Sequence, residues 1–563
     1  MTTTAGTLTF VNGSPRITGQ YSGFDTTAIV EASILAKRLP AIRMESTISE
    51  NELKTAAYGE LNTLLNTFQT ALNSLRNPPG LTGIEDNIFE GKSGFLTSST
   101  TTPATDLLGV SSTNSALTGS YEIEVLQIAA ANKTSSGVIA DSSAAQSVTD
   151  TITIGLSGGT TKDIAITSDM TLNDIAVAIN GETNNTDVRA SVIKVADNDF
   201  RLILTAEETG KAITLSGTGN FLSTYGDGAV LTELQAAEKA QIKVDGIATV
   251  IVRDSNNIAD VIDGLTLQLF KAEVGNTIKV EIDNNLGAAK EAISSFVEAY
   301  NNIRDVIDQS RDYDPASTTG SKPTLYGDDI LRRIERSMND IVSTGASGVD
   351  SGSFNTLGLI GISLDDDNKL KIDDTELDAA LVNNLEGVRN VFEFSFVPDD
   401  SRLAIITRSK ALDIDDFELV IDGVDGSGNI TGASVTGFGN VFDISNASLI
   451  GKEGTAFEGM TMVFVGTPGS GSQTIQVKTS FGIAENFHQS IENFVKPGSG
   501  DLSTRLLEIS AESKELGDRI IALDFRLELT RNFLIEKYAK LEESLAQADA
   551  MRKQLEAMAN ASK

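Results

Sequence analysis

The sequence contains no cysteine and no tryptophan, and it has a single histidine among its 563 residues. Without cysteine the chain cannot form disulfides, thiolate zinc sites or cysteine nucleophiles. One histidine, His488, cannot supply the two imidazoles of an HExxH zinc site, and any histidine-based catalytic triad would depend on it alone. We therefore expect no catalytic residue, no bound metal and no cofactor.

Long apolar runs and a secretion signal are missing as well. No stretch approaches the roughly 18 consecutive apolar residues of a membrane-spanning helix. The first residues, Met1 to Ala5, provide neither the basic region nor the apolar region of a Sec signal. We therefore expect no membrane insertion and no cleaved signal peptide.

Basic residues are scarce relative to acidic ones. The chain has 44 Lys and Arg against 78 Asp and Glu, which gives a formal net charge of −34. Nucleic-acid binding requires clustered Lys and Arg, so that class of partner is excluded. Acidic and basic residues nearly balance in 1–76 and in 501–563, and the middle carries almost all of the charge. Neutral ends can pack against copies or partners, although an ordinary solvated surface is the alternative interpretation.

The N-terminal part predicts helices after a polar start. Residues 1–20 are Thr-rich and aperiodic, and we expect a disordered export segment there. Residues 21–80 predict two stalk helices, one capped by Ser22 or Asp25 and ended by Pro40, and one from 41 to 76. Apolar residues at alternating three- and four-residue steps form a seam in the second helix: Tyr58, Leu61, Leu65, Phe68, Leu72 and Leu75.

The C-terminal part, 483–563, predicts a long coiled-coil helix whose seam includes Leu516, Ile520, Leu523 and Leu527. A narrow apolar stripe needs a partner helix, and the 41–76 helix is the obvious candidate. The register then slips near 530–538 and continues through a second set of positions. We expect that set to be an oligomer or chaperone interface, with a plain intramolecular core as the alternative: Leu534, Tyr538, Leu541 and Leu545.

The middle of the chain alternates between strand-like and helix-like sequence patterns. Short alternating strands over 81–285 predict β-rich head domains, residues 286–395 predict a helical core domain, and 396–482 predict an extra β domain. The extra domain is a possible duplicate of 240–283, because Asp263–Phe270 resembles Glu458–Val465 and Val244–Gly246 resembles Ile421–Gly423. The fold class is therefore α+β and multidomain: a stalk of paired terminal helices, a helical core and inserted antiparallel β heads.

Two kinds of loop could suggest ligand chemistry. Gly466–Ser472 is rich in glycine but lacks the lysine of a phosphate-binding loop and lies between two predicted strands. The acidic stretches 365–368 and 422–429 lack the alternating ligands and distant glutamate of an EF-hand. A hairpin turn and two acidic turns are the simpler interpretations.

Eight stretches, in order along the chain, carry a family resemblance: Tyr21–Val30, Ala36–Pro40, Leu172–Thr205, Phe296–Asn302, Leu325–Asp328, Leu357–Ile362, Asn368–Asp373 and Leu516–Leu527. They resemble the flagellar filament cap family, the flagellar hook-associated protein 2 proteins. The segment 172–205 resembles the motif that flagellins and hook-associated proteins carry in their outer domains.

This resemblance implies a structural assembly factor and not an enzyme. It implies a ring of a few subunits, commonly pentameric in the family, at the extracellular tip of the flagellum, where exported flagellin folds and inserts. Flagellin, the hook–filament junction proteins and a type III export chaperone are the implied partners, with export through the flagellar type III system. The 396–482 segment departs from the family pattern, and so does Glu536–Ala539, which puts the identity of the chaperone in doubt.

Two other functions remain open at this point. A flagellin or a hook–filament junction subunit would share the helix–β–helix plan. A surface adhesin could use the acidic β heads for cell adhesion, in addition to the capping role.

Overall fold

The computed structural model describes residues 7–11, 14–18, 22–23, 25–77, 87–226, 230–313, 322–408 and 414–561. The chain divides into two compact units. The first comprises Met1–Arg76 and Ala292–Lys563, and the second comprises Asn77–Glu291. Mixed helix and antiparallel sheet confirm the predicted fold class.

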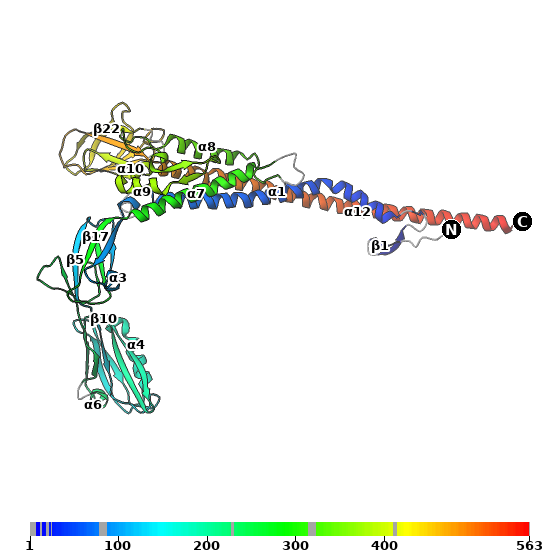
Figure 1. The fold of residues 1–563 in the computed structure, drawn as a ribbon. Helices are drawn as coiled ribbons and strands as arrows, with labels where there is room; N and C mark the ends of the chain where they lie inside the picture. Colours follow the sequence, from blue (N-terminus) through cyan, green and yellow to red (C-terminus); the bar gives the residue numbers. More distant parts are fainter. Residues whose placement is uncertain are drawn as a thin grey trace. The chain divides into compact units, whose positions relative to one another are not determined.

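The stalk of the first unit consists of two long helices that lie side by side (Figure 1). Helix α1 covers Thr26–Asn73 and helix α12 covers Asp501–Ala561. Asp25 caps α1, because its carboxylate accepts a hydrogen bond of 2.9 Å from the backbone N–H of Ala28. The predicted break at Pro40 is wrong: α1 continues through this residue. Packing against α12 offsets the lost backbone hydrogen bond, and the next residue, Ala41, is fully buried.

The prediction of disorder over 1–20 is also wrong for the residues that the structure describes. Strands β1 (Thr7–Val11) and β2 (Ser14–Thr18) pair in an antiparallel ladder. The sequence between them is Asn-Gly, the dipeptide most typical of two-residue hairpins, and Thr7–Val11 alternates polar and apolar residues. Residues 1–6, 12–13 and 19–20 lie outside the described residues.

A helical core packs around the C-terminal half of α1. Phe68 of α1, Phe296 and Tyr300 of α7 and Phe487 of α11 form an aromatic cluster with ring centroids 5.2 to 6.2 Å apart. The core elements are α7 (Leu286–Arg311), α8 (Asp329–Thr344), η2 (Leu357–Ile360), β18 (Ile362–Leu364), β19 (Leu370–Ile372), α9 (Asp374–Asn383), α10 (Leu385–Phe392) and α11 (Ile483–Val495).

The single helix predicted for 483–563 is in fact two helices, α11 and α12. The sequence Lys496-Pro497-Gly498 follows α11, and Gly498 has a φ of +77°. Pro497 lacks the backbone N–H that another helical turn would use, and Gly498 accepts this left-handed conformation, so α11 ends there. Because α11 folds back into the core, it places Phe487 and Ile491 in buried positions and leaves α12 alone to form the stalk with α1.

The extra β domain lies between α10 and α11 and forms two four-stranded antiparallel sheets, ordered β20-β27-β22-β23 and β21-β26-β25-β24. A contiguous apolar core fills the domain and includes Leu419, Phe457 and Met462, all fully buried. Its strands are β20 (Phe394–Pro398), β21 (Leu403–Thr407), β22 (Asp416–Val424), β23 (Ile430–Val435), β24 (Phe442–Ser445), β25 (Ser448–Gly451), β26 (Thr461–Phe464) and β27 (Gln473–Phe481).

The second unit contains two β modules with separate apolar cores. The inner module consists of η1 (Ile88–Glu90), β3 (Lys92–Ser98), α3 (Ala104–Leu107), β4 (Leu108–Ser112), β5 (Gly119–Gln127), β13 (Ala240–Val244), β14 (Ile251–Arg253), β15 (Asn257–Ile258), β16 (Leu265–Leu269) and β17 (Thr277–Asn284).

The outer module is inserted between β5 and β13 of the inner module. Helix α4 covers its sheets with the buried residues Leu172, Ile175 and Ile179. The elements are β6 (Ala131–Ser135), β7 (Asp150–Leu156), β8 (Thr161–Ile166), α4 (Leu172–Gly181), α5 (Thr183–Thr186), β9 (Val188–Ala196), β10 (Asp199–Thr209), β11 (Ile213–Gly217), α6 (Phe221–Tyr225) and β12 (Thr232–Gln235).

The inner module and the extra β domain pair their strands in the same order. Strand β17 pairs with β3 and β5, as β27 pairs with β20 and β22. Strand β16 pairs with β4 and β15, as β26 pairs with β21 and β25, and β5–β13 corresponds to β22–β23. The matched pair Asp263–Phe270 and Glu458–Val465 falls on equivalent strands, whereas Val244–Gly246 and Ile421–Gly423 do not. The duplication itself stays a prediction.

Candidate functional site

The two stalk helices run antiparallel in a register that polar pairs define. Arg38 of α1 binds Asp524 of α12 with an Nε–Oδ1 distance of 2.9 Å. Farther along, Arg531 donates to Glu31 over 2.9 Å. In the opposite direction, the amide of Asn51 donates to the Oγ of Ser513 over 3.2 Å. This register places the start of α1 beside residue 536 of α12, so the last turns of α12 extend beyond α1.

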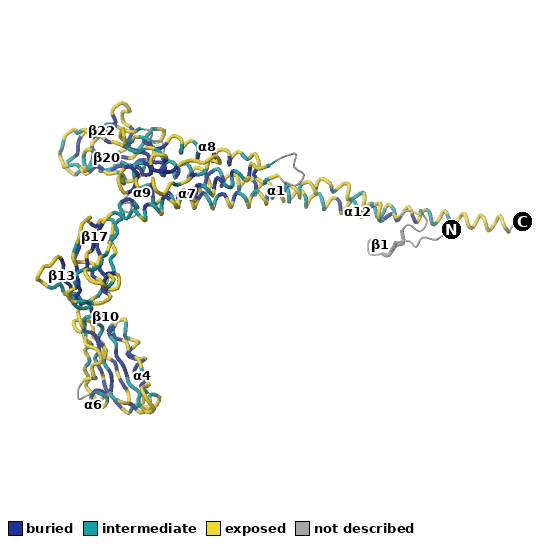
Figure 2. Tube along the Cα trace, in the orientation of Figure 1, coloured by how far each residue is buried: buried dark blue, intermediate teal, exposed yellow. Residues whose placement is uncertain are grey.

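The two apolar sets that the heptad spacing selects do not face each other: the set at 58–75 faces mainly the helical core, and the set at 516–527 faces the N-terminal half of α1. Every residue of the first set has an exposed fraction of 1% or less, the last of them lying just past the end of α1: Tyr58, Leu61, Leu65, Phe68, Leu72 and Leu75. On α12 Leu527 is buried, and Leu516, Ile520 and Leu523 are partly buried. Each α12 side chain faces only α1 at that level and is therefore less enclosed than the α1 side chains beside the helical core (Figure 2).

Tyr58 joins the seam to the helical core. Its hydroxyl donates a hydrogen bond of 2.5 Å to the carboxylate of Asp328, which also caps α8 through the backbone N–H groups of Ile330 and Leu331. Burial and this carboxylate raise the pKa of Tyr58 well above its ordinary value. The hydroxyl stays protonated, and it holds α8 against the stalk.

Beyond residue 536 the partner of α12 changes. The β1–β2 hairpin lies against α12, and the backbone N–H of Ser22 donates to the Glu542 carboxylate over 3.3 Å. Leu534, Tyr538 and Leu545 are partly buried there. Leu541 is 46% exposed and so does not fit the alternative of an intramolecular core, whereas Glu542 beside it is 4% exposed. After Leu534 the buried line advances by two successive four-residue steps, which moves it from 541 to 542.

An apolar stripe that the sequence reasoning missed runs along the outer side of α12. We call it the stalk stripe, and it consists of Ile521, Phe525, Leu529 and Phe533, with exposed fractions of 70, 66, 56 and 62%. Residues four apart share a helix face, so the four side chains form one continuous line. In the sequence these apolar residues recur at every fourth position beside the seam positions. The heptad pattern assigns only the seam positions to an apolar face and so does not include them. The last turns of α12 also expose Met551, Leu555 and Met558.

His488 and the two acidic turns considered in the sequence analysis have structural roles in the fold. His488 lies on α11 beneath the end of α1, and its Nε2 is 3.2 Å from the Nε2 of Gln69. Burial, followed by the charge of Arg76, lowers its pKa to about 4. Asp365 and Asp425 each accept hydrogen bonds from backbone N–H groups of their own turns. Within the part of the chain that the structure describes, no group of three or more His, Asp or Glu is arranged to hold a metal ion.

Membrane association through a spanning helix finds no support in the described residues. Among them, no helix combines the length and the apolar character that crossing a bilayer requires.

Family models match most of the chain. The model described as "Flagellar hook-associated protein 2 C-terminus" matches residues 237–550, and its N-terminal counterpart matches 22–132. The chain belongs to the flagellar hook-associated protein 2 family. A third model, "Flagellin hook IN motif", matches 151–208, which contains the 172–205 stretch. The resemblance inferred from the sequence is confirmed.

Relatives of this family align over most of their own length. The chain is 28% identical to the B-type flagellar hook-associated protein 2 of Pseudomonas aeruginosa over 62% of this chain and 76% of that protein. It is 29% identical to the flagellar hook-associated protein 2 of Escherichia coli over 66% of this chain and 78% of that protein.

Solved structures of the same family also match. The flagellar cap protein FliD D1-D2-D3 domains from Escherichia coli align with 30% identity over 60% of this chain and 89% of that chain, with a TM-score of 0.45. FliD (HAP2) from Pseudomonas aeruginosa PAO1 aligns with 27% identity over 38% of this chain and 99% of that chain, with a TM-score of 0.31.

Proposed function

We propose that this chain caps the tip of the flagellar filament and assists the insertion of exported flagellin, as a structural protein and not as an enzyme. The observation that carries the proposal is the stalk stripe. Four large apolar side chains, more than half exposed, stand in line on a helix whose other face is already occupied by α1. Such a line is costly to leave in water and is typical of a surface that a partner covers.

The proposed partner of the stalk stripe is the growing end of the filament. The two ends of the chain are nearly neutral, so they can enter a crowded assembly without the repulsion that the strongly acidic middle would cause. The stalk would then seat among flagellin and junction-protein subunits, and the β modules would remain outside as the plate of the cap.

Export would take place through the flagellar type III system, without a cleaved signal. During that step the C-terminal part of α12 would bind the export chaperone through Leu534, Tyr538, Leu541 and Leu545. Leu541 is exposed at 46%, and the other three positions are only partly covered. A chaperone that displaces the β1–β2 hairpin would reach all four side chains.

Deletion of the gene tests the proposal. A strain without this chain should retain its hooks and release unpolymerised flagellin into the medium, and the intact gene should restore filaments. Purified protein viewed by electron microscopy should form rings of a few subunits. Full-length filaments on the deletion strain would rule out the capping function.

A further inference from the structure

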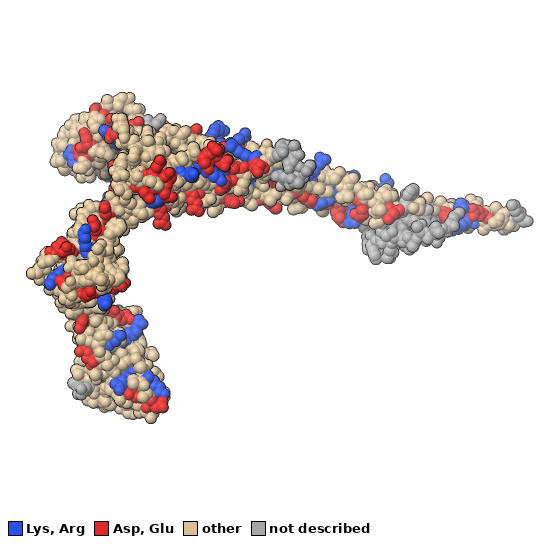
Figure 3. Space-filling view, viewed as in Figure 1, with Lys and Arg blue, Asp and Glu red and all other residues tan. Residues whose placement is uncertain are grey.

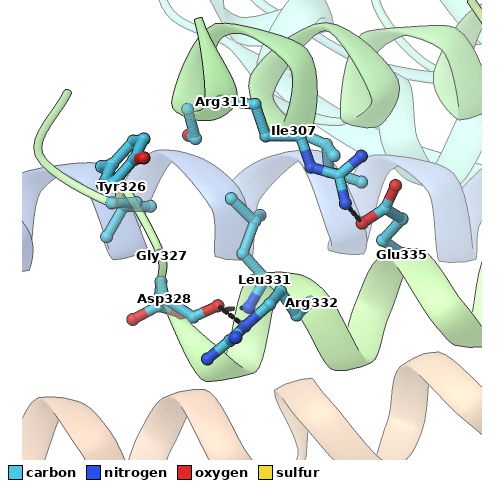
Figure 4. A pocket seen from close by; sticks show the side chains of 10 residues that line it. Ile307, Arg311, Tyr326, Gly327, Asp328, Leu331, Arg332 and Glu335 are labelled. Atoms are coloured by element: carbon cyan, nitrogen blue, oxygen red, sulfur yellow. Dashed lines mark hydrogen bonds and ion pairs between the residues drawn. The ribbon is translucent and has the colours of Figure 1, made fainter. Parts of the chain in front are cut away.

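A pocket opens on the side of the helical core between the end of α7 and the start of α8 (Figure 4). Its volume is about 270 Å³, enough for one or two side chains. Ile307, Leu325 and Leu331 supply apolar lining. Figure 4 shows Asp328 at one end of the pocket, the Arg311–Glu335 ion pair at the other, and Leu331 between them.

The polar side chains that line the pocket already have partners within the chain, except on the side formed by the exposed face of α8. Asp328 accepts three hydrogen bonds, and Glu335 pairs with Arg311. On the exposed face of α8, Arg332 donates only to a backbone carbonyl, and no ion pair to Arg332 or Arg336 occurs among the described residues. In this view of Figure 3, Lys and Arg atoms gather near α8.

An apolar pocket with Arg332 at its rim, and Arg336 one turn farther along the same exposed face of α8, fits an apolar side chain followed by carboxylates. Within a chain of net charge −34, such a rim attracts acidic segments strongly at low ionic strength. The apolar floor distinguishes this surface from a simple anion site, because a free anion would leave the floor uncovered.

The β18–β19 hairpin of the same chain has this composition. Leu364 is 42% exposed, and the exposed residues Asp365, Asp366 and Asp367 follow it directly. The hairpin is rigid before binding, because the Asp365 carboxylate accepts hydrogen bonds of 2.9 and 2.8 Å from the backbone N–H groups of Asp367 and Lys369. A preordered loop loses little conformational entropy on docking.

We propose that Leu364 of one copy inserts into the α7–α8 pocket of a second copy, while Asp366 and Asp367 pair with Arg332 and Arg336. The contact joins neighbouring subunits of the cap, so it rests on the proposed capping function and names the surfaces through which copies meet.

The two surfaces face different directions on one subunit. The pocket uses Ile307 and Arg311 of α7, whereas the hairpin is tied to Asn301 by a hydrogen bond of 2.9 Å and to Asp305 by an ion pair of 2.5 Å. At about 100° per residue these two sets point about 120° apart around the helix. A hairpin therefore cannot reach the pocket of its own chain, and the contact is head-to-tail, the kind that closes into rings.

Charge reversal on the full-length chain tests the contact. Arg332→Glu with Arg336→Glu should weaken self-association in sedimentation velocity at least tenfold, and Asp366→Lys with Asp367→Lys should do the same. The protein that carries all four changes should return to within about threefold of the original. The proposal is overturned if either pair leaves association unchanged or if the fourfold variant is no better than the pairs.

Cross-linking gives a second readout that does not depend on charge. Because the chain has no cysteine, Leu364→Cys in one protein and Tyr326→Cys in another introduce the only thiols. Oxidation of the mixture should yield a disulfide-linked dimer of the two variants. Val382→Cys, which replaces an exposed apolar residue of α9, is the matched control and should not cross-link to Tyr326→Cys. Equal cross-linking of both would overturn the pairing.

The same variants separate this contact from the capping function. In the deletion strain, failure of the unchanged gene to restore filaments would count against capping itself. Normal filaments and normal rings with Asp366→Lys/Asp367→Lys would overturn the contact and leave capping in place. If the reversed α8 face lost flagellin binding while copies still associated, the occupant would be flagellin, and the self-contact would be wrong.

Discussion

At the scale of single residues, a group of well-enclosed charges lies where the extra β domain meets the helices. Glu485 on α11 has a side chain 2% exposed, and it pairs with Arg408, 5% exposed, and with Arg76, 16% exposed. Burial alone would raise the pKa of Glu485, but the two guanidinium groups outweigh it and hold that pKa below its ordinary value. Arg408 also stacks on the ring of Phe394, with 4.4 Å to the centroid.

Glu485→Gln should therefore cost about 3 to 5 kcal/mol of unfolding free energy, because it leaves buried arginines without a counter-charge. Chemical denaturation measures this loss. The matched control is Glu515→Gln, which breaks an exposed pair with Arg519 on α12 and should cost less than about 1 kcal/mol. Similar losses in both variants would contradict the burial argument.

His488 should make stability depend on pH. Its pKa is lowered to about 4 in the folded protein, below the ordinary value of about 6.5, so the unfolded chain binds more protons between these values. Stability from this residue is present above pH 6.5 and is lost as the pH falls towards 4. Between pH 7 and pH 5 the loss should be about 2 kcal/mol.

His488→Gln removes that titration while keeping a polar side chain near Gln69. Unfolding free energies measured at pH 7 and pH 5 should differ by about 2 kcal/mol less in this variant than in the unchanged protein. An identical pH dependence would show that other groups cause the acid sensitivity.

At the scale of elements, α12 has two apolar lines with different roles. Leu527 belongs to the seam, whereas Phe525 and Phe533 belong to the stalk stripe. Phe525→Ser with Phe533→Ser should change thermal stability little, because both side chains are already exposed, yet it should abolish rescue of motility in the deletion strain. Leu527→Ala should lower stability by about 2 kcal/mol or more through the lost packing. Loss of folding in the double serine variant would contradict the assignment of the two lines.

The elements show what the sequence could and could not predict. Heptad spacing located the α1 seam because its side chains are enclosed by several helices and must be apolar. Beyond residue 536 the same spacing does not tell which positions the chain itself covers, because the β1–β2 hairpin replaces α1 as the partner of α12 and Leu541 stays exposed. The break predicted at Pro40 is wrong because packing against the neighbouring helix outweighs the low helix propensity of proline. The α7–α8 pocket joins residues from two separate segments, 307–311 and 325–335, and no local pattern reveals such a site.

At the scale of the whole molecule, one strand connection differs between two β modules of like topology. In the second unit the outer module lies between β5 and β13, whereas β22 and β23 are joined by the turn Asp425–Asn429. A small folded domain inserted within this turn should leave the thermal midpoint nearly unchanged and preserve rescue of motility, since exposed hairpin tips tolerate insertions. The control insertion, after the buried residue Leu419 of β22, should prevent folding. Equal damage at both sites would refute the equivalence.

The antiparallel pairing of α1 with α12 also has a consequence for the order in which the chain can fold. Glu31 and Arg531 meet although 500 positions separate them in sequence, so α1 is synthesised first and must wait for the last helix to gain its partner. Each β module can fold from its own neighbouring strands long before that. A chain cut between the end of β27 and the start of α12 would carry all the strands of the β modules and no stalk. Only a chain that has been synthesised through α12 can therefore form the stalk and enter the assembly.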